Sequence, residues 1–166
     1  MEPDMSVIAS LPETLDPKRE PRALIDHILT RYHETHRREF PELIGLAMRV
    51  EEAHAGHPAL PDNLAFRLKK MHGELEAHMK REELMLFPMM RQGLFGRLSG
   101  PITQMRLDHE EHDAMLGELK ALTGAFHPPA GACGTWRALY RGLEKLCADL
   151  EEHIAIENDI LFPVFE

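Results

Sequence analysis

One pattern occurs twice in this sequence and limits what it can fold into. Residues 78 to 88 read HMKREELMLFP and residues 153 to 163 read HIAIENDILFP, so each copy places a glutamate four residues after a histidine. On an α-helix, residues four apart lie on the same face. Both pairs fall on the apolar stripe of their segment, where such groups are costly to bury unless they are paired or bound to metal. The repeat therefore indicates two helices that bring polar groups into a shared core.

Four long segments carry apolar residues at spacings of three and four, which is typical of amphipathic helices. The expected helices cover residues 21–53, 62–87, 101–126 and 135–162. Pro88 is expected to end the second helix and Thr135 to cap the fourth. No segment shows sustained alternation of apolar and polar residues, so no sheet is expected. Four helices with mostly short connections predict an all-α fold, an antiparallel up-down four-helix bundle.

The composition favours one domain and excludes several classes of partner. The chain has 166 residues, of which 43% are hydrophobic and 28% charged, as in soluble globular proteins. The expected domain covers residues 21–166. Residues 1–20 contain three prolines and little periodicity, so they are expected to form an N-terminal arm that is extended or partly disordered.

Charge and cysteine content point to a cytoplasmic protein. The net charge of -9 disfavours binding to nucleic acid or to an anionic membrane, and no run of 18 apolar residues could span a bilayer. The first 20 residues lack the basic and apolar regions of a secretory signal. Cys133 and Cys147 are too few for a disulfide scaffold. A reduced, cytoplasmic protein is therefore expected.

The first and third helices supply histidines on their own inward stripes. In an up-down bundle, four helix ends share one face, and one histidine of each helix lies roughly 12–18 Å from that face at 1.5 Å per residue. A glutamate lies one turn away on the second and fourth helices. The sequence therefore predicts a metal site with the ligands His33, His78, Glu82, His109, His153 and Glu157.

Four imidazoles and two carboxylates are a suitable ligand set for two metal ions. Two bridging glutamates would hold the pair together and leave room for an oxo or hydroxo bridge and an open position. Imidazole and carboxylate ligands suit iron, manganese or zinc, and the absence of thiolates excludes an iron–sulfur cluster. Iron is the first choice. No catalytic residue separate from the metal site is expected.

Four further residues are candidates for an additional ligand or a supporting contact: His112, His36, His54 and Glu74. The first two lie one helical turn beyond predicted ligands. Glu74 precedes a ligand histidine by four residues, so it can lie above the site. His54 follows His33 by roughly 31 Å along the helix, which places it near the opposite end of the bundle.

The arrangement resembles the hemerythrin-like domain, with H-x-x-x-E on two alternate helices and single histidines on the other two. The segments IDHILTRYHETHRREFPEL, MHGELEAHMKREELMLFPMM, GPITQMRLDHEEH and LEEHIAIENDILFP are similar to the repair-of-iron-centres proteins, over about residues 20 to 165. The resemblance implies a non-haem di-iron centre with carboxylate bridges, held by the six predicted ligands, and His54 matches a further family histidine. It also implies protection from nitric oxide and oxidative stress, with repair of damaged iron–sulfur clusters.

The sequence departs from the family pattern in two ways. Full-length members usually carry an N-terminal domain with a Cys-Cys motif, which this chain is expected to lack because only a short arm precedes the first helix. Oxygen-carrying hemerythrins tend to have H-x-x-x-H on the third helix and an aspartate near the end of the fourth. Here the sequence has H-x-x-H and H-x-x-x-E instead, which argues against a dedicated oxygen carrier.

The leading hypothesis is a cytoplasmic di-iron stress protein with nitric oxide or dioxygen as its small ligand. It would bind or reduce nitric oxide, or supply iron to damaged iron–sulfur proteins or an apo-scaffold. Whether it is an enzyme stays open, because it could be a nitric oxide reductase or, instead, an iron donor or binding protein. The alternatives are a hemerythrin-type oxygen-binding or redox-sensing module, a ferritin-like oxidase and a metal-free helical interaction domain. Ferritin-like sites typically use Glu-x-x-His, with the carboxylate first, which disfavours that class.

Overall fold

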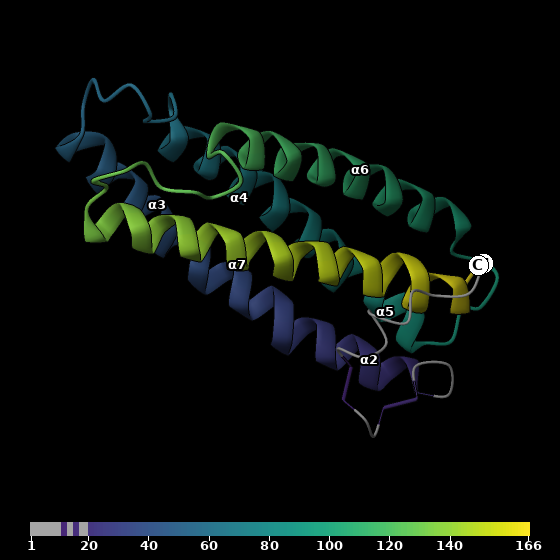
Figure 1. Ribbon diagram of the computed structural model, residues 1–166. Coiled ribbons are helices and arrows are strands. Elements are labelled where there is room, and N and C mark those ends of the chain that lie inside the picture. Colours follow the sequence, from purple (N-terminus) through teal and green to yellow (C-terminus); the bar gives the residue numbers. More distant parts are fainter. Residues whose placement is uncertain (1–10, 13–14, 17–19) are drawn as a thin grey trace.

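The computed structural model describes residues 11–12, 15–16 and 20–166, and within these ranges the regular elements are all helical. Four long rods run side by side and alternate in direction along the chain (Figure 1). The rods are built from α2 (Pro21–Ile28), η1 (Leu29–His33) and α3 (Glu34–Ala53); α4 (Leu64–Arg81), η2 (Glu82–Leu86) and α5 (Phe87–Arg91); α6 (Ser99–Leu122); and α7 (Gly134–Ile156), η3 (Glu157–Leu161) and η4 (Phe162–Val164). The prediction of an antiparallel four-helix bundle is confirmed.

The N-terminal arm lies mostly outside the described residues. Of the part that is described, Leu11 is buried and Leu15 packs beside it, against apolar residues at the end of the bundle where α2 and α5 lie. In the described part of the chain, no helix has both the length and the apolar character needed to cross a membrane.

Three of the four rods contain a π-helical turn next to a predicted ligand. The turn η1 ends at His33, η2 begins at Glu82, and η3 begins at Glu157. A π turn places one extra residue in the helix, and such turns are rare and frequently occur at functional sites. The π turns therefore shift the register of these rods at the level of the predicted ligands.

The π turn also explains why the expected end of the second helix is wrong. Pro88 does not end the helix, which continues as α5 to Arg91. The backbone N–H of Phe87 donates to the carbonyl of Glu82, five residues earlier, so the α-helical ladder is already interrupted before the proline. Proline has no N–H to donate and is tolerated at the first positions of a new helical turn.

The expected cap of the fourth helix is also wrong. The N-cap is Cys133, not Thr135, and its sulfur accepts the backbone N–H of Trp136. The third helix ends at Leu122, before its expected end, because residues 124–126 all have positive φ and cannot continue an α-helix.

The apolar core consists of two clusters, and the predicted ligands lie between them along the rods. One cluster fills the bundle between α3, α4, α6 and α7 and includes Phe40, Leu75, Leu139 and Leu150. The other fills the end near α2 and α5 and includes Ile28, Phe87, Ile102 and Phe162. Apolar packing on both sides therefore fixes the helices at the level of the predicted metal site.

Leu139 tests the contribution of the first cluster. Its side chain is fully buried, so Leu139→Ala should lower the free energy of unfolding by about 2–5 kcal/mol through lost apolar contacts and an internal cavity. Urea unfolding followed by circular dichroism measures the change. Met48→Ala, at a position that is 50% exposed, is the control and should change it by less than about 0.5 kcal/mol. Equal effects of the two substitutions would contradict the described packing.

Candidate metal centre

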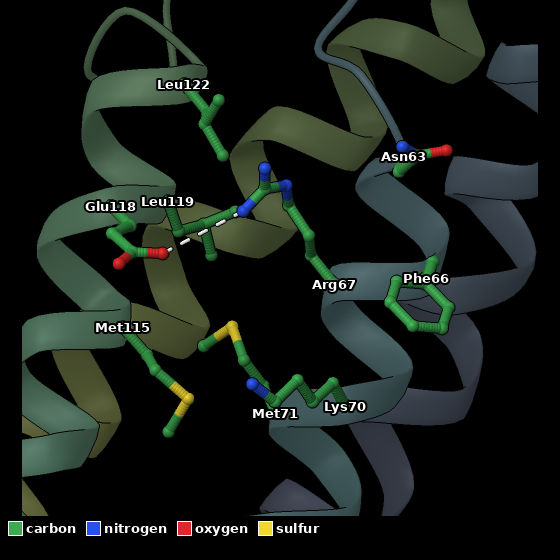
Figure 2. Close-up of a pocket in the computed structure, with 9 residues that line it drawn as sticks. All are labelled: Asn63, Phe66, Arg67, Lys70, Met71, Met115, Glu118, Leu119 and Leu122. Carbon is green, nitrogen blue, oxygen red and sulfur yellow. Dashed lines mark ion pairs between the residues drawn. The ribbon is translucent and has the colours of Figure 1, made fainter.

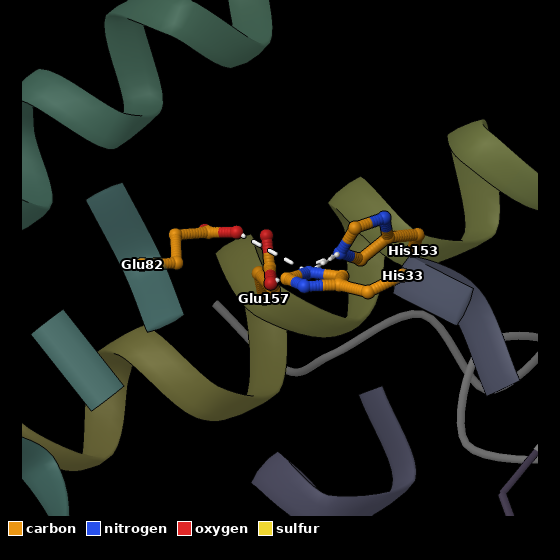
Figure 3. A group of neighbouring side chains, drawn as sticks. All are labelled: His33, Glu82, His153 and Glu157. Atoms are coloured by element: carbon orange, nitrogen blue, oxygen red, sulfur yellow. Dashed lines mark hydrogen bonds and ion pairs between the residues drawn. The ribbon is translucent and has the colours of Figure 1, made fainter. Parts of the chain in front are cut away.

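Six side chains from the four rods meet between the two apolar clusters, and all six are buried. Their ligand atoms form two groups, and within each group the atoms lie within 4.8 Å of one another. The groups are His33, Glu82, His153 and Glu157, and His78, Glu82, His109 and Glu157. Figure 3 shows the first group, with the carboxylates directed toward the two imidazole rings. The six predicted ligands therefore converge, and both glutamates belong to both groups.

Each glutamate directs one carboxylate oxygen to each pair of histidines. The distances from carboxylate oxygen to histidine Nε2 are 3.4 Å for Glu82 Oε2 and His33, 3.3 Å for Glu82 Oε1 and His78, 3.1 Å for Glu157 Oε1 and His153, and 3.1 Å for Glu157 Oε2 and His109. The two oxygens of one carboxylate thus belong to different groups. This arrangement would allow one carboxylate to serve a cation in each group.

The ligand atoms of the two groups leave much of one another's hydrogen-bonding capacity unsatisfied. Both oxygens of Glu82 and Oε2 of Glu157 are buried and have no hydrogen-bond partner among the described residues. The Nε2 atoms also face each other in pairs, at 3.2 Å for His33 and His153 and at 3.1 Å for His78 and His109. Buried acceptors without donors are costly. Two cations, one in each group, would satisfy these atoms, so the donor set fits a pair of metal ions.

Each of the four histidines is held at its other nitrogen by a residue from the next rod. The Nδ1 contacts are His33 with Glu83 at 2.7 Å, His78 with Asp108 at 3.1 Å, His109 with Asn158 at 2.8 Å, and His153 with Nε2 of His36 at 3.3 Å. These contacts pass from the first rod to the second, third and fourth and back to the first. We call the four residues that hold the histidines, Glu83, Asp108, Asn158 and His36, the outer ring. When Nδ1–H donates to the outer ring, the Nε2 lone pair is left facing the centre, as metal binding requires.

Two of the additional candidates lie beside the six. His36 belongs to the outer ring, and burial lowers its pKa to about 2, so it is neutral and can accept a hydrogen bond. His112 is buried with its ring 5.0 Å from that of His78, but it belongs to neither group of ligand atoms. Burial lowers the pKa of His112 to about 4. Both residues therefore lie beside the centre as uncharged imidazoles.

The other two candidates lie away from the six. Glu74 has a side chain that is 44% exposed and forms an ion pair with Lys70 at 3.8 Å. His54 is the C-cap of α3, where its Nε2 lies 3.1 Å from the sulfur of Cys133. Neither residue belongs to a group of ligand atoms at the centre.

Three members of the outer ring escaped the sequence analysis, although a signal was present. Glu83, Asp108 and Asn158 each adjoin a predicted ligand in sequence, at positions 82, 109 and 157. Adjacent residues of a helix point in different directions, so these side chains face the next rod when their neighbours face the centre. A polar residue next to an inward ligand is therefore the pattern to look for. Arg37 holds Glu83 through two hydrogen bonds of 2.7 and 3.1 Å, and Arg81 contacts Asp108.

The ionisation of the six groups shows that the centre attracts positive charge. Burial opposes protonation of His78, but Glu82, Glu157 and Asp108 together outweigh it and raise the pKa of His78 to about 9. Burial also opposes ionisation of Glu157, but His153 and His109 lie so close that its pKa is lowered well below the ordinary value. The carboxylates are therefore ionised at neutral pH. Protonated imidazole or bound metal must balance them.

A surface pocket of about 280 Å³ lies between α4 and α6 (Figure 2). Met71, Met115 and Leu119 form part of its apolar lining, and Arg67 and Glu118 form an ion pair of 3.8 Å at its edge. None of the six predicted ligands lines it.

Comparison with known proteins gives a consistent result. Residues 24–165 match the model of the hemerythrin HHE cation binding domain. The chain is 43% identical over 164 residues to the iron-sulfur cluster repair protein YtfE of Escherichia coli O81 (strain ED1a), which covers 98% of this chain and 74% of that protein. The same protein of Escherichia fergusonii (strain ATCC 35469) matches with the same identity and coverage.

Metal binding should strengthen as the pH rises. In the metal-free protein His78 has a pKa raised to about 9, so at neutral pH it carries a proton that a metal must displace. Lower pH favours this protonated, metal-free form, and the affinity should therefore rise from pH 6 toward pH 9. Competition with a chelator measures the affinity for Zn²⁺, and calorimetry in two buffers of different ionisation enthalpy counts the protons released. Affinity that does not change with pH would contradict this assignment.

The outer ring should contribute to affinity without touching the metal. Asp108→Ala removes the acceptor at Nδ1 of His78, and we expect it to weaken binding of Zn²⁺ about 10–100-fold. Asp113→Ala is the control, because Asp113 is an exposed residue of the same helix outside the outer ring. Both affinities follow from the same chelator competition. Equal affinities of the two variants would show that the contact with Asp108 is not needed.

Proposed function

Because the chain belongs to the hemerythrin HHE cation-binding family, we propose that it is a di-iron protein that acts in repair of iron–sulfur clusters during nitrosative or oxidative stress. The proposed iron ligands are His33, His78, Glu82, His109, His153 and Glu157. One observation carries the proposal: each buried glutamate directs one oxygen to each pair of histidines. A single cation would leave two carboxylate oxygens and one histidine pair unused.

The donor set and the relatives together favour iron. Neutral imidazoles and carboxylates suit iron, manganese and zinc, and no thiolate belongs to either group of ligand atoms. Among these metals, the repair of iron–sulfur clusters named for the relatives selects iron. A bound ferrous pair would supply electrons and open positions for a small molecule such as nitric oxide, or iron for a damaged cluster.

The walls of the centre select what can reach it. Aromatic rings cover three of the four histidines, with centroid distances of 5.9 Å for Phe87 and His33, 5.8 Å for Phe162 and His109, and 5.3 Å for Tyr32 and His153. Such an apolar enclosure excludes charged molecules, whose desolvation is expensive, and admits a small uncharged diatomic. Nitric oxide meets this requirement, and so does dioxygen.

The outer ring supports a ligand set that holds iron with moderate strength. Asn158 and His36 are uncharged acceptors, so they increase the basicity of the imidazoles that they hold only slightly. Glu83 and Asp108 are carboxylates, but Arg37 pairs with Glu83 and Arg81 with Asp108, and the pKa of each carboxylate is lowered despite burial. An acceptor that is already paired with a cation increases the basicity of a histidine less than a free carboxylate does. This favours a centre that can release ferrous iron.

Removal of either bridging glutamate should affect both metal positions. We expect two irons per chain in protein that is loaded and purified without oxygen. Glu82→Leu and Glu157→Leu should each retain less than one, because each removes a ligand from both positions. Glu118→Leu, at a side chain that is 70% exposed, is the control and should retain two. Metal analysis with optical spectroscopy measures this, and circular dichroism checks the fold. A wild-type chain with one iron or fewer would contradict the di-iron proposal.

The chemical role is tested on the same iron-loaded protein. Nitric oxide should change the optical spectrum, and a ferrous chelator should remove iron within hours. If nitric oxide produces no spectral change, it is not a ligand of the centre. If the chelator removes no iron, the protein is not an iron donor. A stable and reversible dioxygen adduct would instead identify an oxygen-binding or sensing module.

A further inference from the structure

The two cysteines of the chain lie in opposite environments, and one of them takes part in a contact that the metal centre does not use. Cys147 is 1% exposed, and burial raises the pKa of its thiol to about 12. Cys133 is partly exposed at the N-cap of α7. Its sulfur accepts the backbone N–H of Trp136 at 3.4 Å, and Nε2 of His54 lies 3.1 Å away. An imidazole from another helix is thus in direct contact with the sulfur of this partly exposed cysteine.

His54 is held in place from two sides. It is the C-cap of α3, and the backbone N–H of His57 donates to its carbonyl at 2.9 Å. Its ring packs on the indole of Trp136 with a centroid distance of 5.0 Å, and the ring of His57 packs on the same indole at 5.2 Å. The imidazole therefore needs little rearrangement to act on the sulfur. His33 is roughly 31 Å away along the same rod, so this pair is remote from the metal centre.

We propose that Cys133 is a nucleophilic thiol, assisted by His54, that undergoes thiol–disulfide exchange with low-molecular-mass disulfides. The thiol proton passes to Nε2 of His54 as the sulfur attacks one sulfur of the disulfide. The disulfide bond breaks, the second sulfur leaves as a thiolate, and that thiolate takes up the proton. The disulfide is the oxidant and is reduced to one free thiol, while Cys133 becomes a mixed disulfide. The N–H of Trp136 and the N-terminal end of α7 stabilise negative charge on the attacking sulfur.

The product cannot continue to an internal disulfide. Cys147 lies 14 residues further along α7, roughly 21 Å away along the helix axis, and a disulfide requires Cα atoms within about 7 Å. Burial of Cys147 also removes it from reagents in solution. The mixed disulfide on Cys133 should therefore persist until an external thiol reduces it. This makes the site a reversible modification site on a protein proposed to act under oxidative stress.

The proposal is tested by treating the folded, iron-loaded protein with glutathione disulfide at neutral pH and mapping the adducts by mass spectrometry. We expect one glutathionyl group per chain, on Cys133, with Cys147 unmodified and the iron content unchanged. Folded Cys133 should also react faster than the same residue in the chain unfolded with guanidinium. A rate that is equal or slower in the folded protein would overturn the proposal, and this comparison needs no variant.

The role of His54 is tested with a matched pair of substitutions. His54→Gln should slow exchange at Cys133 about tenfold or more, since it removes the proton acceptor. His57→Gln is the control, because His57 packs on the same indole, whereas the imidazole that contacts the Cys133 sulfur is that of His54. It should leave the rate unchanged. Equal rates in the two variants would overturn the assignment of His54, and circular dichroism confirms that both are folded.

Discussion

Two ionised glutamates buried at the centre of the bundle impose the constraint on which the rest of the structure depends. Glu82 and Glu157 have no exposed surface, and three of their four oxygens have no hydrogen-bond partner among the described residues. An uncompensated buried carboxylate costs several kcal/mol. The Nε2 atoms of four histidines face these oxygens and complete two groups of ligand atoms, and a cation in each group would remove the penalty. The two apolar clusters on either side keep the helices in place around this charge.

The contacts of the outer ring make the geometry of the centre depend on how the four rods pack together. Each histidine is oriented by a side chain of the next rod, so displacement of one helix would release a histidine on another. The π turns serve the same purpose at the level of the backbone, since η1, η2 and η3 each begin or end at a predicted ligand. Regions that adopt rare helical geometry at a functional site are stabilised by the packing around them. Here that packing comes from the cluster near α2 and α5, which covers the π turns.

Much of this centre could be predicted from the sequence, because the helical repeat converts spacing into position. The spacing of four between His78 and Glu82 and between His153 and Glu157 fixed their shared face, and counting residues from the helix ends placed four histidines at one depth. The fold class followed from the same periodicity. The remote position of His54 also followed from the rise per residue.

The remaining features depend on contacts between helices that a single sequence does not display. A π turn changes the register by one residue, which leaves the apolar periodicity nearly intact, so the continuation past Pro88 was missed. Cys133 caps α7 because its sulfur meets the N–H of Trp136 and the ring of His54, and His54 is 79 residues away in sequence. Glu83, Asp108 and Asn158 were missed because they adjoin the inward-facing residues in sequence but face the next rod.

We propose that two cations share the two glutamates. X-ray absorption at the iron edge of the iron-loaded protein tests it most directly, because it reports the atoms around each metal. Two irons that share the glutamates should give a shell of nitrogen and oxygen atoms with two imidazoles per iron, together with scattering from a neighbouring iron. Isolated iron without a metal neighbour, or sulfur in the shell, would contradict it.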